Sequence, residues 1–295
     1  TPLGMKRTTA YISLAKKNNW PMAVPYSAFG PNGLQRVYLE KNDNTMQSAG
    51  GLITTPSDIA TWLQVQLTDG KLKNKQVFPT QVMQTTHTGI ASFDKGSGLF
   101  SAAGEYGLGW SISKYRDEKV IYHFGGYPGY RAHISFMPGK KTGLAIFVNE
   151  GSIGSAAVDI LAAYVYDWTT GATNITDTYA KKLEELELNY TKAVEGSQRS
   201  YADRSKRTSQ LTMPLQTYTG TYRHPYFGDM QVAIENNVLS VTMGNLHAVS
   251  TPFTQKETIR VELIPGTGQV VAFKSDETGK ISSLTYDGQE YKRVM

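Results

Sequence analysis

The sequence predicts an α+β protein in which an antiparallel sheet with covering helices precedes a small all-β domain. Three observations support this fold class. Short strand patterns separated by turns lie between about residues 107 and 149, a polar helix-prone stretch covers 173–207, and alternating strands and turns continue from about residue 211. We therefore expect three parts: residues 1–171, a helical linker at 172–210 and a β-domain at 211–295.

The clearest helix start in the first part is at Thr55. Thr55 can cap the helix, Pro56 fits the first helical position, and Asp58 stands at the third position, as in a capping box. Apolar residues at helical spacing follow until Gly70, which favours a helix end. This segment is predicted to be an amphipathic helix that packs on the sheet.

Four successive strands form the predicted sheet, at 107–114, 119–124, 130–137 and 143–149. The short turns between them favour an antiparallel meander. Residues 155–168 then place apolar side chains at helical spacing, so we expect this helix to cover the sheet. Within the linker, a narrow apolar stripe in polar sequence predicts one further helix.

Seven strand patterns separated by Gly, Asn and Asp turns predict a barrel or sandwich in the β-domain. These strands lie at 219–223, 230–234, 238–242, 259–263, 270–273, 281–285 and 291–294. The segments 218–225 and 279–284 resemble the lipocalin-like module that is often attached to bacterial hydrolases of the β-lactamase family.

Composition excludes several classes of function. The 295 residues contain no Cys, so disulfides, thiolate metal sites and Cys nucleophiles are excluded. The formal net charge is +5, but the basic residues are dispersed, and we expect no nucleic-acid partner. No apolar run is long enough to predict a membrane span. The five His lack metal-binding spacing and no dinucleotide-binding motif is present, so we expect no cofactor and no metal.

Two neighbouring motifs point to a site. The first is Tyr-Gly-Leu-Gly-Trp at 106–110, and the second is His-Phe-Gly-Gly-Tyr-Pro-Gly-Tyr at 123–130. An extended strand with two glycines lets a substrate backbone approach without a Cβ in the way. Four neighbouring side chains are candidates for lining the substrate cleft beside this strand: Tyr122, Tyr127, Tyr130 and Arg131.

This pair of motifs resembles the penicillin-recognising serine hydrolases, which comprise class C β-lactamases, D-Ala-D-Ala carboxypeptidases and related esterases. The resemblance implies that His123 is the cationic or hydrogen-bonding residue of the site strand, Gly125 the close-approach residue, and the Gly126 amide an oxyanion donor. Phe124 stands where the family usually has Thr or Ser, which favours an ester over penicillin as substrate. The candidate catalytic residues are therefore His123 and Gly126, and the candidate substrate-binding residues are Phe124, Gly125, Tyr127 and Arg131.

The nucleophile and base motifs of that family are not matched convincingly. Two four-residue segments, 13–16 and 111–114, fit Ser-x-x-Lys, but the second lies in a predicted strand, where residues three apart point to opposite faces. Residues 141–143 spell Lys-Thr-Gly but lie at a predicted turn, and no Tyr-x-Asn occurs. An active enzyme that uses Ser13 and Lys16 would require both side chains beside His123.

The resemblance implies a serine hydrolase that forms an acyl-enzyme on an amide or ester carbonyl of a small molecule or peptide. The chain opens on Thr1-Pro2-Leu3-Gly4-Met5, which in the family follows both catalytic motifs. We therefore expect a fragment, inactive alone, whose partner is the missing N-terminal half and whose last strand, 143–149, is an exposed edge. The alternative is a non-catalytic protein that binds a peptide, glycan or lipid. The family resemblance also implies a periplasmic or secreted location.

Overall fold

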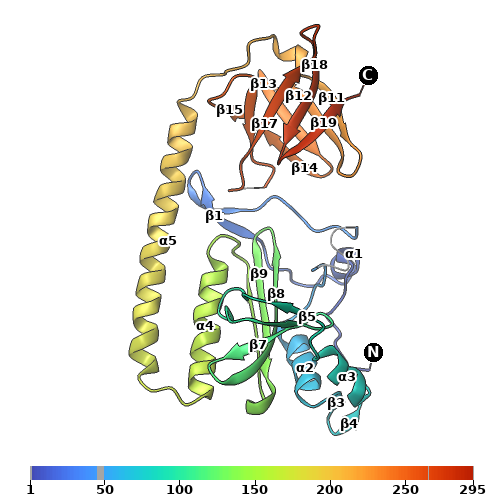
Figure 1. Cartoon of the computed structure of the whole chain (residues 1–295), viewed down its shortest axis with the longest axis vertical. Coiled ribbons are helices and arrows are strands. Elements are labelled where there is room, and N and C mark those ends of the chain that lie inside the picture. The colour runs from blue at the N-terminus through green and yellow to red at the C-terminus, as the bar shows by residue number, and fades with distance from the viewer. Residues whose placement is uncertain (1, 45–49, 265, 295) are drawn as a thin grey trace. The chain divides into compact units, whose positions relative to one another are not determined.

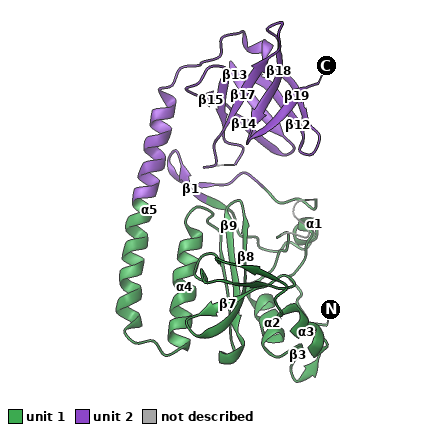
Figure 2. Ribbon diagram, viewed as in Figure 1, with its two compact units in different colours: residues 1–26, 40–191 green, residues 27–39, 192–295 purple. Residues whose placement is uncertain are grey.

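The computed structural model describes residues 2–44, 50–264 and 266–294 (Figure 1). Internal contacts divide the chain into two compact units (Figure 2). Residues 1–26 and 40–191 form the first unit, and residues 27–39 and 192–295 form the second. The contacts thus group 27–39 with the β-domain and place the other boundary inside a helix, whereas the sequence led us to expect boundaries near 171 and 210.

The first unit contains an antiparallel sheet of six strands in sequential order, which confirms the predicted meander. The predicted strand 107–114 is shorter than expected, because residues 107–110 form a turn closed by a hydrogen bond of 2.8 Å from the Gly107 amide to the Trp110 carbonyl. The strands are β5 (Ala91–Phe93), β6 (Gly104–Tyr106), β7 (Ser111–Tyr115), β8 (Glu118–Tyr127), β9 (Tyr130–Met137) and β10 (Thr142–Val148).

Two helices cover the sheet. Helix α2 (Pro56–Leu67) starts as predicted, since the Thr55 hydroxyl accepts a hydrogen bond of 3.3 Å from the Asp58 amide. It packs with Ile121 of β8, whereas Tyr166 of helix α4 (Gly154–Thr169) packs with Tyr122. Successive strand residues point to opposite faces. The two helices therefore cover opposite faces of the sheet, and both predicted helices are confirmed.

Short elements surround this sheet in the first unit. They are α1 (Ile12–Lys17), β3 (Lys71–Leu72), β4 (Lys75–Gln76), α3 (Thr80–Thr86) and the 3₁₀ turn η1 (Pro138–Lys140). The small sheet of β1 (Tyr26–Gly30) and β2 (Gly33–Arg36) begins at the end of the first unit and continues into the second.

Helix α5 (Ile175–Ser205) confirms the helix predicted in the linker. None of the described helices, including α5, is both long enough and apolar enough to cross a membrane.

The β-domain of the second unit is one antiparallel sheet of nine strands. Its two end strands, β14 (Leu246–Val249) and β15 (Thr251–Pro252), are joined by Ser250 alone, so the sheet must curl to bring its ends together. The expected barrel is thus confirmed as a nearly closed sheet. Its other strands are β11 (Gly220–His224), β12 (Gly228–Glu235), β13 (Val238–Met243), β16 (Thr258–Val261), β17 (Gln269–Ser275), β18 (Ile281–Tyr286) and β19 (Gln289–Arg293).

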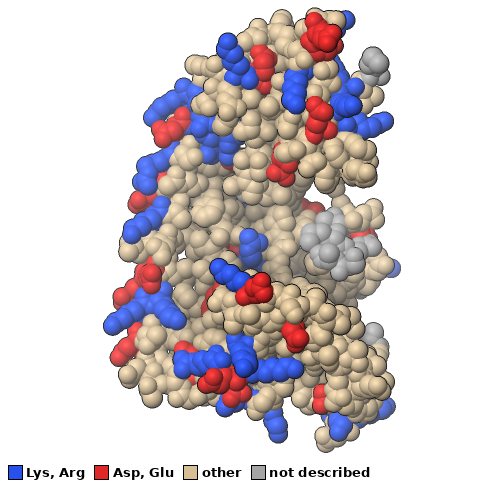
Figure 3. Space-filling view, viewed as in Figure 1, with Lys and Arg blue, Asp and Glu red and all other residues tan. Residues whose placement is uncertain are grey.

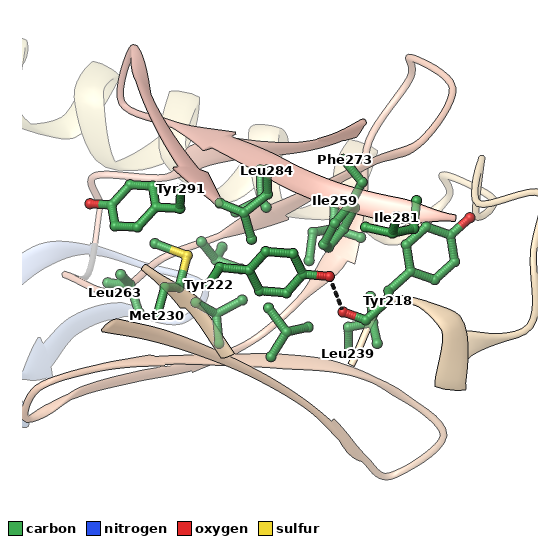
Figure 4. Close-up of a cluster of buried hydrophobic side chains, with 14 residues drawn as sticks. Tyr218, Tyr222, Met230, Leu239, Ile259, Leu263, Phe273, Ile281, Leu284 and Tyr291 are labelled. Atoms are coloured by element: carbon green, nitrogen blue, oxygen red, sulfur yellow. Dashed lines mark hydrogen bonds between the residues drawn. The ribbon is translucent and has the colours of Figure 1, made fainter. Parts of the chain in front are cut away.

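Fourteen buried side chains fill the interior of this barrel (Figure 4). Tyr222 lies in the middle of the cluster, and its hydroxyl donates a hydrogen bond of 2.7 Å to the carbonyl of Tyr218 at one end of it. The polar group of a fully buried tyrosine is thereby satisfied inside an apolar core. The residues of this core lie far apart in the sequence, and their packing stabilises the β-domain.

Candidate active site

The end of strand β8 has a free edge. β8 pairs with β9 from Ile121 to Tyr127, but it pairs with β7 only as far as Tyr122. Within the described residues, the segment 123–127 is therefore paired along one side only. An extended ligand can add to such an edge through backbone hydrogen bonds. This segment contains the residues that the motif predicted to form the site strand.

The two sequence motifs meet beside this free edge. The Tyr106 hydroxyl lies 3.4 Å from Nε2 of His123, and Nδ1 of His123 lies 2.8 Å from the Phe124 carbonyl oxygen. A carbonyl oxygen only accepts, so Nδ1 carries a proton, and in the neutral ring Nε2 accepts from Tyr106. Both side chains are exposed, so the imidazole can exchange Tyr106 for a ligand atom.

The turn after Tyr106 is fixed by Trp110. Trp110 is buried, and its ring packs edge to face on Phe136 with centroids 5.2 Å apart. Gly109 adopts φ of +84°, which favours glycine over other residues. The buried indole and the glycine turn thus hold Tyr106 at the surface, on the side of His123. This explains the role of the Tyr-Gly-Leu-Gly-Trp motif.

The Phe124 side chain points away from His123. It packs against Phe100, Tyr122 and His133, with ring centroids at 6.0, 5.0 and 5.0 Å. Its side chain therefore belongs to the aromatic core beneath the sheet. At this position only the backbone is available to a ligand at the free edge.

Gly125 and Gly126 lie in the middle of the free edge, opposite Ala132 and Arg131 on β9. A Cβ on Gly126 would lie 3.2 Å from Nη1 of Arg131, so the guanidinium occupies the space above this glycine. Arg131 is fixed there by a hydrogen bond of 2.9 Å from Nη1 to the Tyr130 carbonyl. Successive strand residues point to opposite faces, so Arg131, which is paired with Gly126, lies on the face of Phe124 and not on that of His123. The structure thus brings His123 and both glycines together along the free edge, whereas Arg131 lies on the other face of the sheet.

Tyr127 and Tyr130 close the hairpin at the end of this segment, with ring centroids 6.4 Å apart. Burial raises the pKa of Tyr127, so its hydroxyl stays neutral and able to donate. The Tyr130 hydroxyl donates to the Ala23 carbonyl at 2.6 Å, which fixes the hairpin to the segment before β1. The hairpin end is therefore rigidly placed.

A buried polar chain that sequence reasoning missed lies on the Phe124 side of the sheet. Nε2 of His133 and the Ser135 hydroxyl are 2.6 Å apart, and the Ser135 hydroxyl lies 2.6 Å from that of Tyr166 on α4. Nδ1 of His133 is buried with no hydrogen-bond partner among the described residues. Burial lowers the pKa of His133 to about 4, so the ring is neutral at pH 7. The only sequence signal for this polar chain was the alternation of side chains along β9, which places His133 and Ser135 on the same face.

The Ser-x-x-Lys segments do not make contact with His123. The Ser13 amide donates to Asp43 at 3.0 Å, and Lys16 forms an exposed ion pair with Glu40 at 3.2 Å. Ser111 and Lys114 lie on strand β7, as predicted, and so point to opposite faces of the sheet. Neither pair forms a nucleophile and base in this geometry. Of the Lys-Thr-Gly segment, Lys141 lies in the turn after η1, but residues 142 and 143 begin strand β10, so the turn predicted for all three is wrong for these two.

The described side chains around the site do not form a metal-binding group. In the described part of the chain, no three His, Asp or Glu side chains come together as ligands for a metal ion. On the face shown in Figure 3, acidic and basic side chains are interspersed over both units. The free edge itself offers the backbone hydrogen-bond donors and acceptors of residues 123–127.

Two family models match the chain. Residues 1–166 match the family model described as Beta-lactamase, which is more than half of the chain. The chain belongs to the beta-lactamase family. Residues 204–293 match a second family model, described as a domain of unknown function (DUF3471). The first match contains α2 and the six-stranded sheet, and the second contains the nine strands of the barrel.

Individual relatives are distant. The chain is 23% identical over 274 residues to a protein named "Unguisins hydrolase ungD" from Aspergillus violaceofuscus, and the match covers 85% of this chain and 46% of that protein. The chain thus spans about half the length of the curated relatives it matches. A second relative, from Aspergillus campestris, is 24% identical and carries a similar name.

Matches among solved structures include an octameric penicillin-binding protein homologue from Pyrococcus abyssi, at 18% identity and a TM-score of 0.47. That match covers 98% of this chain and 57% of the other. A class C beta-lactamase from Rhodobacter sphaeroides matches at 17% identity and a TM-score of 0.37, over 54% of this chain and 48% of the other.

Proposed function

We propose that this beta-lactamase-family scaffold serves a serine hydrolase that acts through an acyl-enzyme on an amide or ester carbonyl. The observation that carries the proposal is the free edge at 123–127, with two glycines in it and the Tyr106–His123 pair beside it. An acyl-transfer site needs an edge of this kind to align the substrate and a backbone donor for the oxyanion.

In this proposal the Ser hydroxyl adds to the substrate carbonyl while a base takes its proton. The tetrahedral oxyanion accepts a hydrogen bond from the Gly126 amide, and collapse expels the alcohol or amine, which receives the proton. Water then adds to the acyl carbonyl while the base takes one of its protons, and collapse of this second tetrahedral intermediate releases the acid and returns the proton to the Ser oxygen. His123 hydrogen-bonds the substrate at the free edge.

We further propose that the nucleophile and the base belong to residues that are not among the 295 of this sequence. Ser13 and Lys16 bind other groups, and Ser111 and Lys114 point apart, so among the described residues neither Ser-x-x-Lys pair forms a dyad beside His123. The β10 end of the sheet is consistent with a missing part. β10 pairs only with β9 among the described residues, and Phe147 on it is 37% exposed.

The test is intact-protein mass spectrometry after incubation with a fluorophosphonate and, separately, with a penicillin. The measurements compare this chain with a version extended upstream. We expect an adduct on the longer protein only. Labelling of the present chain would overturn the proposal that the nucleophile lies outside this sequence. The variant Ser13→Ala would then show whether Ser13 is the labelled residue.

A variant of the longer protein tests the site strand itself. His123→Ala should slow fluorophosphonate labelling or ester hydrolysis by about 10²-fold, the usual loss for a hydrogen-bonding group that acts on the transition state. His247→Ala, which changes an exposed histidine of the barrel, is the matched control. Equal rates for the two variants would remove His123 from the mechanism.

A further inference from the structure

The second unit carries a pocket outside the barrel core. One face of α5 forms one wall, and residues at the end of β16 form the other. Its volume is about 270 Å³, below the usual range for drug-sized ligands, so it suits a small molecule. The lining residues that carry charge or hydroxyl groups are Ser197, Ser200, Tyr201, Arg204, Arg260 and Glu262.

Two arginines share one carboxylate in this pocket. Nη2 of Arg204 lies 3.4 Å from Oε1 of Glu262, and Nη2 of Arg260 lies 2.6 Å from the same oxygen. The Tyr201 hydroxyl donates to the other oxygen. The three charged side chains are only 11%, 14% and 17% exposed, so water screens them weakly. One positive charge is left without a counter-charge in this cluster.

Glu262 is ionised in this setting. Burial alone would raise its pKa, but hydrogen bonds from Tyr201 and Arg260 hold the pKa of the carboxyl below its ordinary value. The carboxylate carries one negative charge and already accepts hydrogen bonds from three donors. It therefore does not neutralise both guanidinium groups.

Many donors in the pocket remain available. Each guanidinium has five N–H groups. Hydrogen bonds to described residues use one N–H of Arg260 and two of Arg204, whose Nη1 donates to the Ser200 hydroxyl at 2.6 Å. Since Ser200 accepts in that bond, its own proton can be donated to a ligand. An oxyanion would accept from both arginines and from Ser200.

Gly268 makes the position of Arg260 possible. A Cβ on this residue would lie 1.6 Å from Nη2 of Arg260, so any larger side chain must displace the guanidinium. The glycine thus leaves a space that the charged group fills.

We propose that this pocket binds the oxyanion group, a carboxylate or a phosphate, of a small ligand, through Arg204, Arg260 and Ser200. A planar guanidinium donates two parallel hydrogen bonds to either group, and one uncompensated charge matches one bound anion. Phe29 and Ala193 also line the pocket and suit a small apolar body on the ligand, whereas the Arg204 guanidinium lies over the Tyr201 ring, 4.0 Å from its centroid. This site is separate from the free edge of β8 and does not depend on hydrolase activity.

The test titrates the intact chain with inorganic phosphate by calorimetry and with 4-fluorobenzoate by fluorine NMR. We expect saturable binding of one or both probes, and the probe that binds identifies phosphate or carboxylate as the ligand chemistry. Arg204→Gln should weaken binding by about tenfold or more. Gly268→Ala should do the same with all charges retained, because it displaces Arg260.

Arg199→Gln is the matched control, since Arg199 lies on the same helix, is 69% exposed and is not a lining residue. It should bind like the unmodified chain. Circular dichroism verifies that each variant folds, and if Arg204→Gln does not, Gly268→Ala decides. The proposal is overturned if neither probe binds up to about 20 mM, or if both pocket variants bind as tightly as the control.

Discussion

His133 shows how a single buried residue can make stability depend on pH. Its ring is neutral in the folded state, with a pKa of about 4, whereas an unfolded chain gives His a pKa near 6.5. Between these values the unfolded state binds more protons, so the free energy of unfolding falls as pH falls. We expect a loss of roughly 2–3 kcal/mol between pH 7.5 and pH 4.5.

Urea unfolding at the two pH values measures this loss. The variant His133→Gln should show a smaller pH dependence, whatever its stability at pH 7.5. Some dependence will remain, because burial also lowers the pKa of His87. An unchanged pH dependence in the variant would mean that His133 is not the titrating group.

Phe124 offers a second prediction at this scale, because its ring is packed with Phe100 and His133. Phe124→Thr places the family's usual hydroxyl residue on the site strand but removes the ring from the core. We expect the free energy of unfolding to fall by about 2–4 kcal/mol. Phe227→Thr, at a residue that is 57% exposed, should change it by less than about 0.5 kcal/mol.

The candidate site was only partly predictable from its residues. Tyr106 and His123 were found because their motifs are local and carry glycines that mark turns and close approach. The chain from His133 through Ser135 to Tyr166 was not, because it depends on how α4 packs on β9. No short-range pattern encodes a hydrogen bond between residues 31 positions apart.

At the scale of elements, the start of α2 depends on one side chain. The Thr55 hydroxyl accepts from the Asp58 amide, which would otherwise lack a partner in the helix. Thr55→Ala should lower the free energy of unfolding by about 1 kcal/mol, and Thr55→Ser should restore most of it. Equal stability of the Ala and Ser variants in urea unfolding would contradict the capping role.

The edge strand β10 gives a prediction that bears on the proposed function. An edge strand leaves alternate amides without a partner. Hydrogen exchange along 142–148 should therefore alternate between slow and fast amides in this chain. In the upstream-extended protein, we expect the fast amides to become protected. If they stay fast, the missing nucleophile does not come with a strand that completes this sheet.

Elements with strong local signals were predicted well, and short ones were not. The cap at Thr55 predicted the start of α2, and the strand pattern at 130–137 predicted both ends of β9. β5, β6 and β15 have two or three residues each, too few to show an alternation. They are strands because their neighbours supply hydrogen bonds.

At the scale of the whole molecule, the two units have separate hydrophobic cores. Phe136 belongs to a core in the first unit and Leu284 to the core of the second, and each is fully buried. Phe136→Ala and Leu284→Ala should each remove about 3 kcal/mol or more, but from different units. In scanning calorimetry each variant should shift a different transition. A single transition shifted by both variants would show that the units unfold together.

The division into units was the least predictable feature, because residues 27–39 contain no composition change. They belong to the second unit through single contacts, such as the Ser197 hydroxyl that donates to the Phe29 carbonyl at 3.1 Å and the Tyr38 hydroxyl that donates to the Leu263 carbonyl. Such contacts join residues more than 150 positions apart, and no local pattern predicts them.

This interleaved connectivity sets an order of events during synthesis. Residues 27–39 leave the ribosome about 150 residues before the first of their partners at 192–295. At the usual elongation rate this is a wait of roughly 8–30 s. During that interval the hairpin of β1 and β2 has no barrel beside it, while the first unit's strands are already being completed. Pulse-labelled nascent chains should therefore gain protease resistance in the sheet of β5–β10 before they gain it at residues 27–39.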